Sequence, residues 1–145
     1  MYIQYYQSRL ACNHATGDFN WCFFFQFVEL DNLENDNLLE TPVACTNDSI
    51  YHTGTRINSD KHLDGIYDQY MEPAVVIHHN CTSTHKTVHF TTSLPVFLTS
   101  ETRVEAVFFS DVTDKGVEAS FWKLLAYLFS DKYCILKSRK YCFFD

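Results

Sequence analysis

Glycine and proline are scarce in this chain. Its 145 residues include only 4 Gly and 3 Pro, and no Pro/Gly/Ser-rich linker or internal repeat separates one part from another. Without such breaks the elements should pack as one body, since chains of this length commonly form a single core. The sequence therefore predicts a single domain spanning residues 1–145.

Basic residues are also few. Eleven Lys and Arg stand against 18 Asp and Glu, which leaves a formal net charge of -7. A surface of that sign repels nucleic-acid phosphates unless a local basic patch overrides it, and the patch LKSRKY at 136–141 lies in an expected strand. We expect no nucleic-acid partner.

Long hydrophobic runs and a secretion signal are missing as well. The most apolar stretch, WCFFFQFVEL at 21–30, is far shorter than the roughly 20 residues needed to cross a bilayer. The first residues, MYIQYYQSRL, lack the basic start and apolar run of a signal peptide. The sequence predicts a cytoplasmic protein with no membrane partner.

Six cysteines are present, and none of them forms a CxxC pair. Their even number would suit disulfides in a secreted chain, and the sequons NDS at 47–49 and NCT at 80–82 would suit N-glycosylation. Because the N-terminus does not support export, we expect buried, reduced cysteines. No metal is expected either, since adjacent His78 and His79 would point to opposite sides of an extended chain.

The spacing of the apolar residues along the chain predicts an α+β fold. Apolar residues at helical spacing predict helices over about 2–14, from Asp18 or Asn20 into the acidic stretch at 30–37, and over 58–72. A short strand at 49–55 precedes the third helix, and residues 74–85 pass through a polar loop. From Thr87 onward a period of two predicts an antiparallel meander with strands at about 86–98, 103–112, 117–129 and 133–144.

Three stretches carry a resemblance to a known family. TGDFNW at 16–21, VHFTTSLPVFLTSETRVEAVFF at 88–109 and DKYCILKSRKYCFFD at 131–145 are similar to the nuclear transport factor 2-like superfamily, SnoaL-like group. The chain departs from that pattern by lacking a tryptophan near Tyr133 and by its acidic insert at 31–48. The resemblance implies a cone of three helices on a curved sheet, a cystatin-like roll, with an apolar cavity.

His89 is the strongest candidate for chemistry. It shares a strand face with Thr87, Thr91 and Ser93, and an imidazole titrates near neutrality, so it can move protons in a dry cavity. The competing interpretation is a histidine that only completes a hydrogen bond within the fold. The sequence thus predicts His89 as a general base.

A second proton-transferring group has four candidates. The resemblance implies a histidine on the strand that follows His89, but the chain has Ser110 and Asp111 there, and alternation favours Ser110 as the inward residue. His52, before the third expected helix, and His14, at the end of the first, are the other two.

Aromatic residues would line the expected cavity. Aromatic walls with a few convergent polar groups are typical of small-molecule sites, although the same residues equally suit a packed core. No phosphate-cradling glycine loop is present, so no cofactor is expected. The ligand-binding residues expected are Tyr6, Phe25, Tyr70, Thr91, Phe108 and Trp122.

Two functions follow from these expectations. The first is a cofactor-free isomerase, dehydratase or cyclase that acts on a small apolar molecule by proton transfer from the pocket histidine. The second is a non-catalytic ligand-binding or dimeric interaction module. The last two expected strands are apolar at both parities, so we also expect a homodimer through the outer sheet face.

Overall fold

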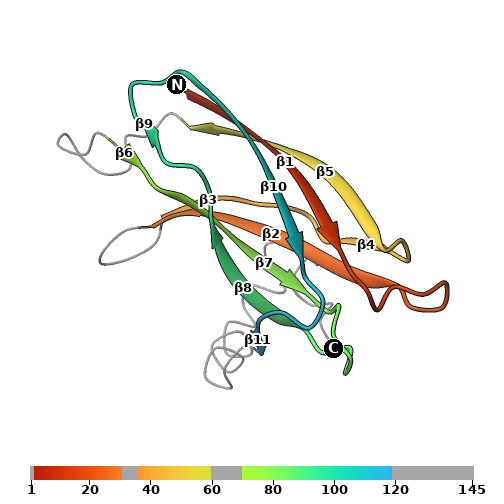
Figure 1. Cartoon of the computed structure of the whole chain (residues 1–145). Coiled ribbons are helices and arrows are strands. Elements are labelled where there is room, and N and C mark those ends of the chain that lie inside the picture. The colour runs from red at the N-terminus through yellow and green to blue at the C-terminus, as the bar shows by residue number, and fades with distance from the viewer. Residues whose placement is uncertain (1, 31–35, 60–69, 119–145) are drawn as a thin grey trace, which may run out of the picture.

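The chain begins with a strand at the centre of a three-stranded sheet. The computed structural model describes residues 2–30, 36–59 and 70–118. In it β1 (Tyr2–Ala11) pairs antiparallel with β5 (Ile50–Ser59) and parallel with β10 (Arg103–Asp111). These strands lie side by side in Figure 1, with β1 between the other two.

A second, larger sheet lies against the first. Its strands follow the order β11-β8-β7-β2-β3, and β4 also pairs with β2. A separate pair of short strands, β6 and β9, lies near the N-terminus (Figure 1). The bounds are β2 Trp21–Glu29, β3 Asp36–Glu40, β4 Ala44–Thr46, β6 Tyr70–Met71, β7 Pro73–His79, β8 Val88–Ser93, β9 Phe97–Leu98 and β11 Val117–Glu118.

The hydrophobic core fills the space between these two layers. Both sheets contribute alternate residues to it, as strands with one buried face must. Aromatic rings make much of the contact: Tyr6 stacks on Phe27 with centroids 5.2 Å apart, and Phe25 meets Phe108 edge-on at 5.6 Å. The buried members include Tyr6, Leu10, Trp21, Phe23, Phe25, Phe27, Ile57, Val75 and Ile77.

Two disulfides join strands that are distant in sequence. Cys12, just after β1, bonds to Cys81, just after β7, and both are fully buried, so this bond links one sheet to the other. Cys22 of β2 bonds to Cys45 of β4 within the larger sheet, and Cys45 is exposed. The expectation of reduced cysteines is therefore wrong for these four. Cys134 and Cys142 lie outside the described residues.

The expected α+β fold is also wrong, because the described residues form strands and no helix. The clearest case is β2, where a helix was expected. In WCFFFQFV nearly every position is apolar, so spacings of two and of 3.6 residues fit equally well. Aromatic residues favour strands, and Trp21, Phe23, Phe25 and Phe27 all point into the core.

The first expected helix fails for a related reason. In β1 the buried residues are Gln4, Tyr6, Ser8 and Leu10, an alternation that includes two polar side chains. Polar residues on the buried face conceal a period of two from a search for apolar positions. The cone of helices and the α+β roll are accordingly not the architecture of this chain.

The expected strands were located better than their pairing. β5, β8 and β10 fall within the segments predicted at 49–55, 86–98 and 103–112 or overlap them. The hairpin between the last two is wrong, because β8 pairs with β7 whereas β10 crosses to the other sheet and pairs with β1. The predicted loop at 74–85 contains all of β7 but its first residue, Pro73. Most of the third expected helix and the strands beyond 118 lie outside the described residues.

No helix long and apolar enough to span a membrane occurs in the part of the chain that the structure describes.

The inter-sheet disulfide should contribute more to stability than the one within a sheet. Cys12 and Cys81 are 69 residues apart and Cys22 and Cys45 only 23. From loop-closure entropy, replacing the first pair by Ala should lower the free energy of unfolding by about 4 kcal/mol, and the second pair by about 3 kcal/mol. Urea denaturation measures both losses.

Peptide mapping of the unreduced wild-type protein provides a test that does not require the variants to fold. It should recover Cys12 linked to Cys81 and Cys22 linked to Cys45. Any other partner for these four residues would contradict the assigned topology.

Candidate functional site

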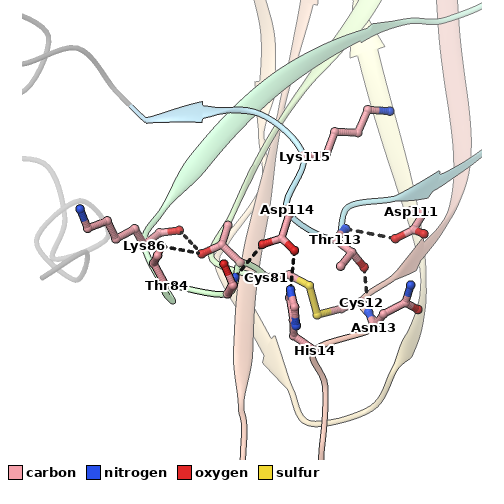
Figure 2. A network of polar contacts seen from close by, with 12 residues as sticks. Cys12, Asn13, His14, Cys81, Thr84, Lys86, Asp111, Thr113, Asp114 and Lys115 are labelled. Carbon is pink, nitrogen blue, oxygen red and sulfur yellow. Dashed lines mark hydrogen bonds and ion pairs between the residues drawn. A yellow bond between two sulfur atoms is a disulfide. The ribbon is translucent and has the colours of Figure 1, made fainter.

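Three loops meet at one end of the two-sheet structure, around the disulfide Cys12–Cys81 (Figure 2). They are the connections from β1 to β2, from β7 to β8 and from β10 to β11. The backbone N–H of Asp114 donates to the Cys81 carbonyl at 2.9 Å, and that of Asn13 donates to Thr113 Oγ1 at 2.8 Å. This loop end is where the structure concentrates its polar contacts.

A hydrogen bond between His14 and Asp114 lies at the centre of the network. His14 Nε2 is 2.6 Å from Asp114 Oδ2, and the backbone N–H of Ser83 donates to Oδ1 at 2.6 Å. One carboxylate thus connects all three loops. The His14 hydrogen bond, followed by the Ser83 amide, lowers the pKa of Asp114 below its ordinary value.

His79 lies buried beneath the same loops. Its Nε2 is 2.7 Å from the Lys115 carbonyl, and its Nδ1 lies 3.1 Å from the backbone N–H of Cys81. Because a carbonyl can only accept and an amide can only donate, the ring must be neutral with its proton on Nε2. Burial also lowers the pKa of His79. This histidine fixes the loop that carries Cys81.

The backbone of these loops adopts uncommon φ values and approaches β8 closely. His85, Asp114 and Gly116 have positive φ values of 58°, 53° and 118°. A Cβ at Gly116 would lie 2.7 Å from the His89 carbonyl oxygen, so only glycine allows this approach to β8. The ring of His85 stacks on Phe19 with centroids 3.9 Å apart.

The structure separates most of the expected catalytic residues. Ser110 is buried at the end of β10, as the alternation predicts, and the carboxylate of neighbouring Asp111 is exposed and accepts the Thr113 N–H at 3.1 Å. His52 is exposed on β5. Of the five, His14 and Asp111 share the loop end, where both contact the 113–114 segment (Figure 2).

His89 belongs to the other sheet. On β8 the residues that face the first sheet are Val88, Phe90 and Thr92, whereas His89 alternates with them and shares the opposite face with Thr91 and Ser93. Its ring stacks on that of His78 at 5.5 Å, and His78 stacks on Phe24 at 4.2 Å. The structure therefore places His89 on the outer face of the larger sheet, away from Ser110.

The expected ligand-binding residues divide into three groups. Tyr6, Phe25 and Phe108 come together between the sheets, where the Tyr6 hydroxyl donates to Gln4 Oε1 at 2.7 Å and burial raises the pKa of the phenol. Tyr70 and Thr91 are exposed on β6 and β8. Trp122 lies outside the described residues.

A different surface, the outer face of the β10-β1-β5 sheet, escaped the sequence analysis. Its residues alternate with the buried ones, and they include two exposed apolar side chains, Val107 at 72% and Phe109 at 61%. Each faces a residue of β1 in the register: Val107 lies opposite Gln7, and Phe109 opposite Arg9. Apolar groups this exposed within a sheet are typical of a binding surface.

All three arginines of the described residues lie on this outer face of the β10-β1-β5 sheet. We call it the arginine face. The Arg9 guanidinium carbon is 5.4 Å from the centre of the Phe109 ring, and those of Arg56 and Arg103 lie 5.6 and 4.9 Å from the Tyr5 ring. Two acids share this face: Glu105, which pairs with Arg103, and Asp111 at the end of β10. Three arginines against two acids leave this face with a small excess of positive charge on a chain of net charge -7.

Periodicity could have located this surface only after the fold was known. Arg9, Arg56 and Arg103 follow one another at intervals of 47 residues in sequence and come from strands that pair through β1. No short motif contains two of them. Among the residues that the structure describes, moreover, no group of three or more His, Cys, Asp or Glu side chains could hold a metal ion.

The two packed sheets, the inter-sheet disulfide and the exposed arginine face define a disulfide-linked β domain. The family model that matches the chain, over residues 7–121, is "Caenorhabditis elegans protein of unknown function (DUF870)". The chain belongs to this family. Its resemblance to the nuclear transport factor 2-like superfamily and the SnoaL-like group is overturned by this match and by the described residues, which form strands only. No curated protein and no solved structure matches the chain.

The charge of Asp114 should stabilise the protein at neutral pH and not in acid. A carboxylate whose pKa is lowered on folding contributes stability above its unfolded pKa, and this contribution is lost as the pH falls through the lowered folded value. We expect Asp114→Asn, which tolerates positive φ, to melt below wild type at pH 7. The two melting temperatures should converge below pH 3.8, the ordinary value for Asp.

Glu101→Gln is the matched control, since it removes an exposed carboxylate that has no ion pair in the described part of the chain. Its melting temperature should follow wild type throughout. A constant deficit for Asp114→Asn at every pH would contradict a role for the charge.

His79 should resist protonation. Its lowered pKa means that the unfolded chain takes up a proton as the pH falls below 6.5 before the folded protein does, so stability declines with acidification by at most about 1.4 kcal/mol per pH unit from this residue. Nitrogen NMR of the ring should show the proton on Nε2 at pH 7 and no change at pH 6. Urea-unfolded protein provides the titrating reference, and a doubly protonated ring at pH 6 in the folded state would refute the assignment.

Proposed function

We propose that this domain is a non-catalytic binding module whose arginine face recognises an acidic protein segment. The observation that carries the proposal is the convergence of Arg9, Arg56 and Arg103 on one exposed sheet face beside aromatic rings. Arginine and aromatic residues are enriched at the centres of protein interfaces. Charge complementarity points to an anionic partner.

The apolar residues decide between two kinds of anion. A sulfated glycan would use the guanidinium groups but has no use for Val107 and Phe109, which are among the most exposed apolar side chains described. A protein segment that places acidic and apolar side chains on the same side would use both. Such a segment, when extended, presents one side to a flat sheet face.

Proton transfer from His89 has less support. That mechanism needs the imidazole and a second group in a shared hollow, and His89 lies on a different sheet and a different face from Ser110 and His52. His14 has a carboxylate partner, but that carboxylate also holds the loops together. The interaction module is therefore the function we carry forward.

We further infer that the module works in an oxidising compartment and not in the cytosol. Disulfides persist in secreted and extracellular proteins and are rare where glutathione keeps thiols reduced. Cys22–Cys45 is accessible through exposed Cys45, so cytosolic reductants would reach it. A homodimer through the last expected strands remains a separate prediction, since residues 119–145 lie outside the described part of the chain.

A labelled peptide of repeated Glu-Ser-Phe-Ser, which when extended places its Glu and Phe on one side, provides a direct test. Fluorescence anisotropy should show binding that weakens with added salt, and Arg9→Ala and Arg103→Ala should each weaken it by about tenfold. Val107→Ser should also weaken it. Lys86→Ala and Val117→Ser are the matched controls, because Lys86 is exposed in the β7–β8 loop and Val117 is exposed on β11 of the other sheet, and they should leave binding unchanged.

Two results would contradict the proposal. Equal losses in the control variants would show binding without a defined surface. Tight binding of heparin that is insensitive to Val107→Ser, with none of the peptide, would identify a glycan in place of a protein segment. Light scattering on the same samples reports whether a second copy occupies the face.

A further inference from the structure

The two glycosylation sequons have different structural settings. Asparagine followed by any residue but proline and then Ser or Thr is the acceptor signal, and the signal alone does not distinguish NDS at 47–49 from NCT at 80–82. The disulfides favour an oxidising compartment, where this modification takes place. We propose that Asn47 carries an N-linked glycan in the native protein and that Asn80 does not.

Asn47 lies in an exposed turn between β4 and β5, and its two sequon neighbours are exposed as well. The turn is held by its backbone: Trp21 Nε1 donates to the Asp48 carbonyl at 2.8 Å, and the Cys12 N–H donates to the Ser49 carbonyl at 2.8 Å. The side chain of Asn47 makes no hydrogen bond within the described residues. A sugar on its Nδ2 would therefore displace no contact in this part of the fold.

Asn80 is built into the larger sheet. Its Oδ1 accepts the Cys22 N–H at 2.7 Å and its own N–H donates to the Cys22 carbonyl at 3.2 Å, so the residue extends the pairing of β7 with β2. A sugar on its Nδ2 would have to be accommodated against that pairing.

The rest of this sequon is also enclosed. Cys81 is in the buried disulfide, and Thr82 is only 6% exposed with its hydroxyl donating to the Lys86 carbonyl at 3.0 Å. The acceptor signal depends on that hydroxyl. Folding and closure of Cys12–Cys81 therefore make the NCT sequon inaccessible to the enzyme that transfers the glycan. The NDS sequon stays accessible.

The reaction itself is a group transfer. The Nδ2 of Asn47 attacks the anomeric carbon of an oligosaccharide carried on a polyprenyl diphosphate. The new bond is N–C, the sugar–diphosphate bond breaks, the lipid diphosphate leaves with the electron pair, and Nδ2 loses one proton. No oxidant or reductant takes part.

The test uses the full chain, secreted from insect cells behind an added signal sequence. Glycopeptide mapping should find a glycan on the peptide containing Asn47, which peptide-N-glycosidase removes while converting Asn47 to Asp. The peptide containing Asn80 should be unmodified. Ser49→Ala keeps Asn47 and the turn's backbone contacts but destroys the acceptor signal, so the secreted variant should lose the glycan.

The outcomes distinguish this proposal from its alternatives. A folded, secreted protein with a glycan at Asn80, or with an unmodified Asn47, would overturn it. Asn80→Gln should leave the glycan mass unchanged, and where that variant fails to be secreted the mapping of wild type still decides. The inference rests on the oxidising compartment inferred above and not on the arginine face, so failure of peptide binding leaves it intact.

Discussion

The bond between Cys12 and Cys81 is the constraint on which the rest of this structure depends. It ties the end of β1, the central strand of one sheet, to the end of β7 in the other, and both sulfur atoms lie in the core. The hydrophobic effect brings the two sheets together but has no direction. The disulfide adds a fixed point, and it brings three loops to one place.

The polar network at that place is best understood as structural. Asp114 accepts from two loops, His79 is neutral and satisfied on both ring nitrogens, and Gly116 lets a loop lie against β8. Each of these features would also suit a catalytic site when viewed alone. Together they account for one another, because the contacts of Asp114 with His14, Ser83 and Cys81 connect the loops that the disulfide has gathered.

The arginine face, unlike the polar network at the loop end, is an exposed surface suited to binding a partner. Its guanidinium groups lie over aromatic rings on the open side of a sheet, with apolar neighbours that the core does not use. A domain with a rigid, disulfide-linked interior can present such a face without rearranging when a partner binds, which reduces the entropic cost of association. Our proposals therefore assign the interior and the loop end to stability, the arginine face to recognition and the Asn47 turn to modification.

The sequence by itself determined the composition-level properties and the position of several strands. Residues 103–111 alternate clearly and form β10, and SIYHTGT lies in β5. The Asn47 sequon and the inward direction of Ser110 were also readable locally. Where the apolar run was continuous, as in β2, or the buried face contained polar residues such as Gln4 and Ser8, local periodicity misled, and the expected helices and the family resemblance failed with it.

Only the tertiary structure decided which cysteines pair, which strands neighbour one another and which histidine faces where. These are contacts between residues far apart in sequence: Cys12 with Cys81, Arg9 with Phe109, His14 with Asp114. Local propensity has no information on such pairs, since a strand offers the same hydrogen-bonding groups to any neighbour. Burial of the aromatic faces and closure of the disulfides select one arrangement, and that selection placed three distant arginines on a single surface.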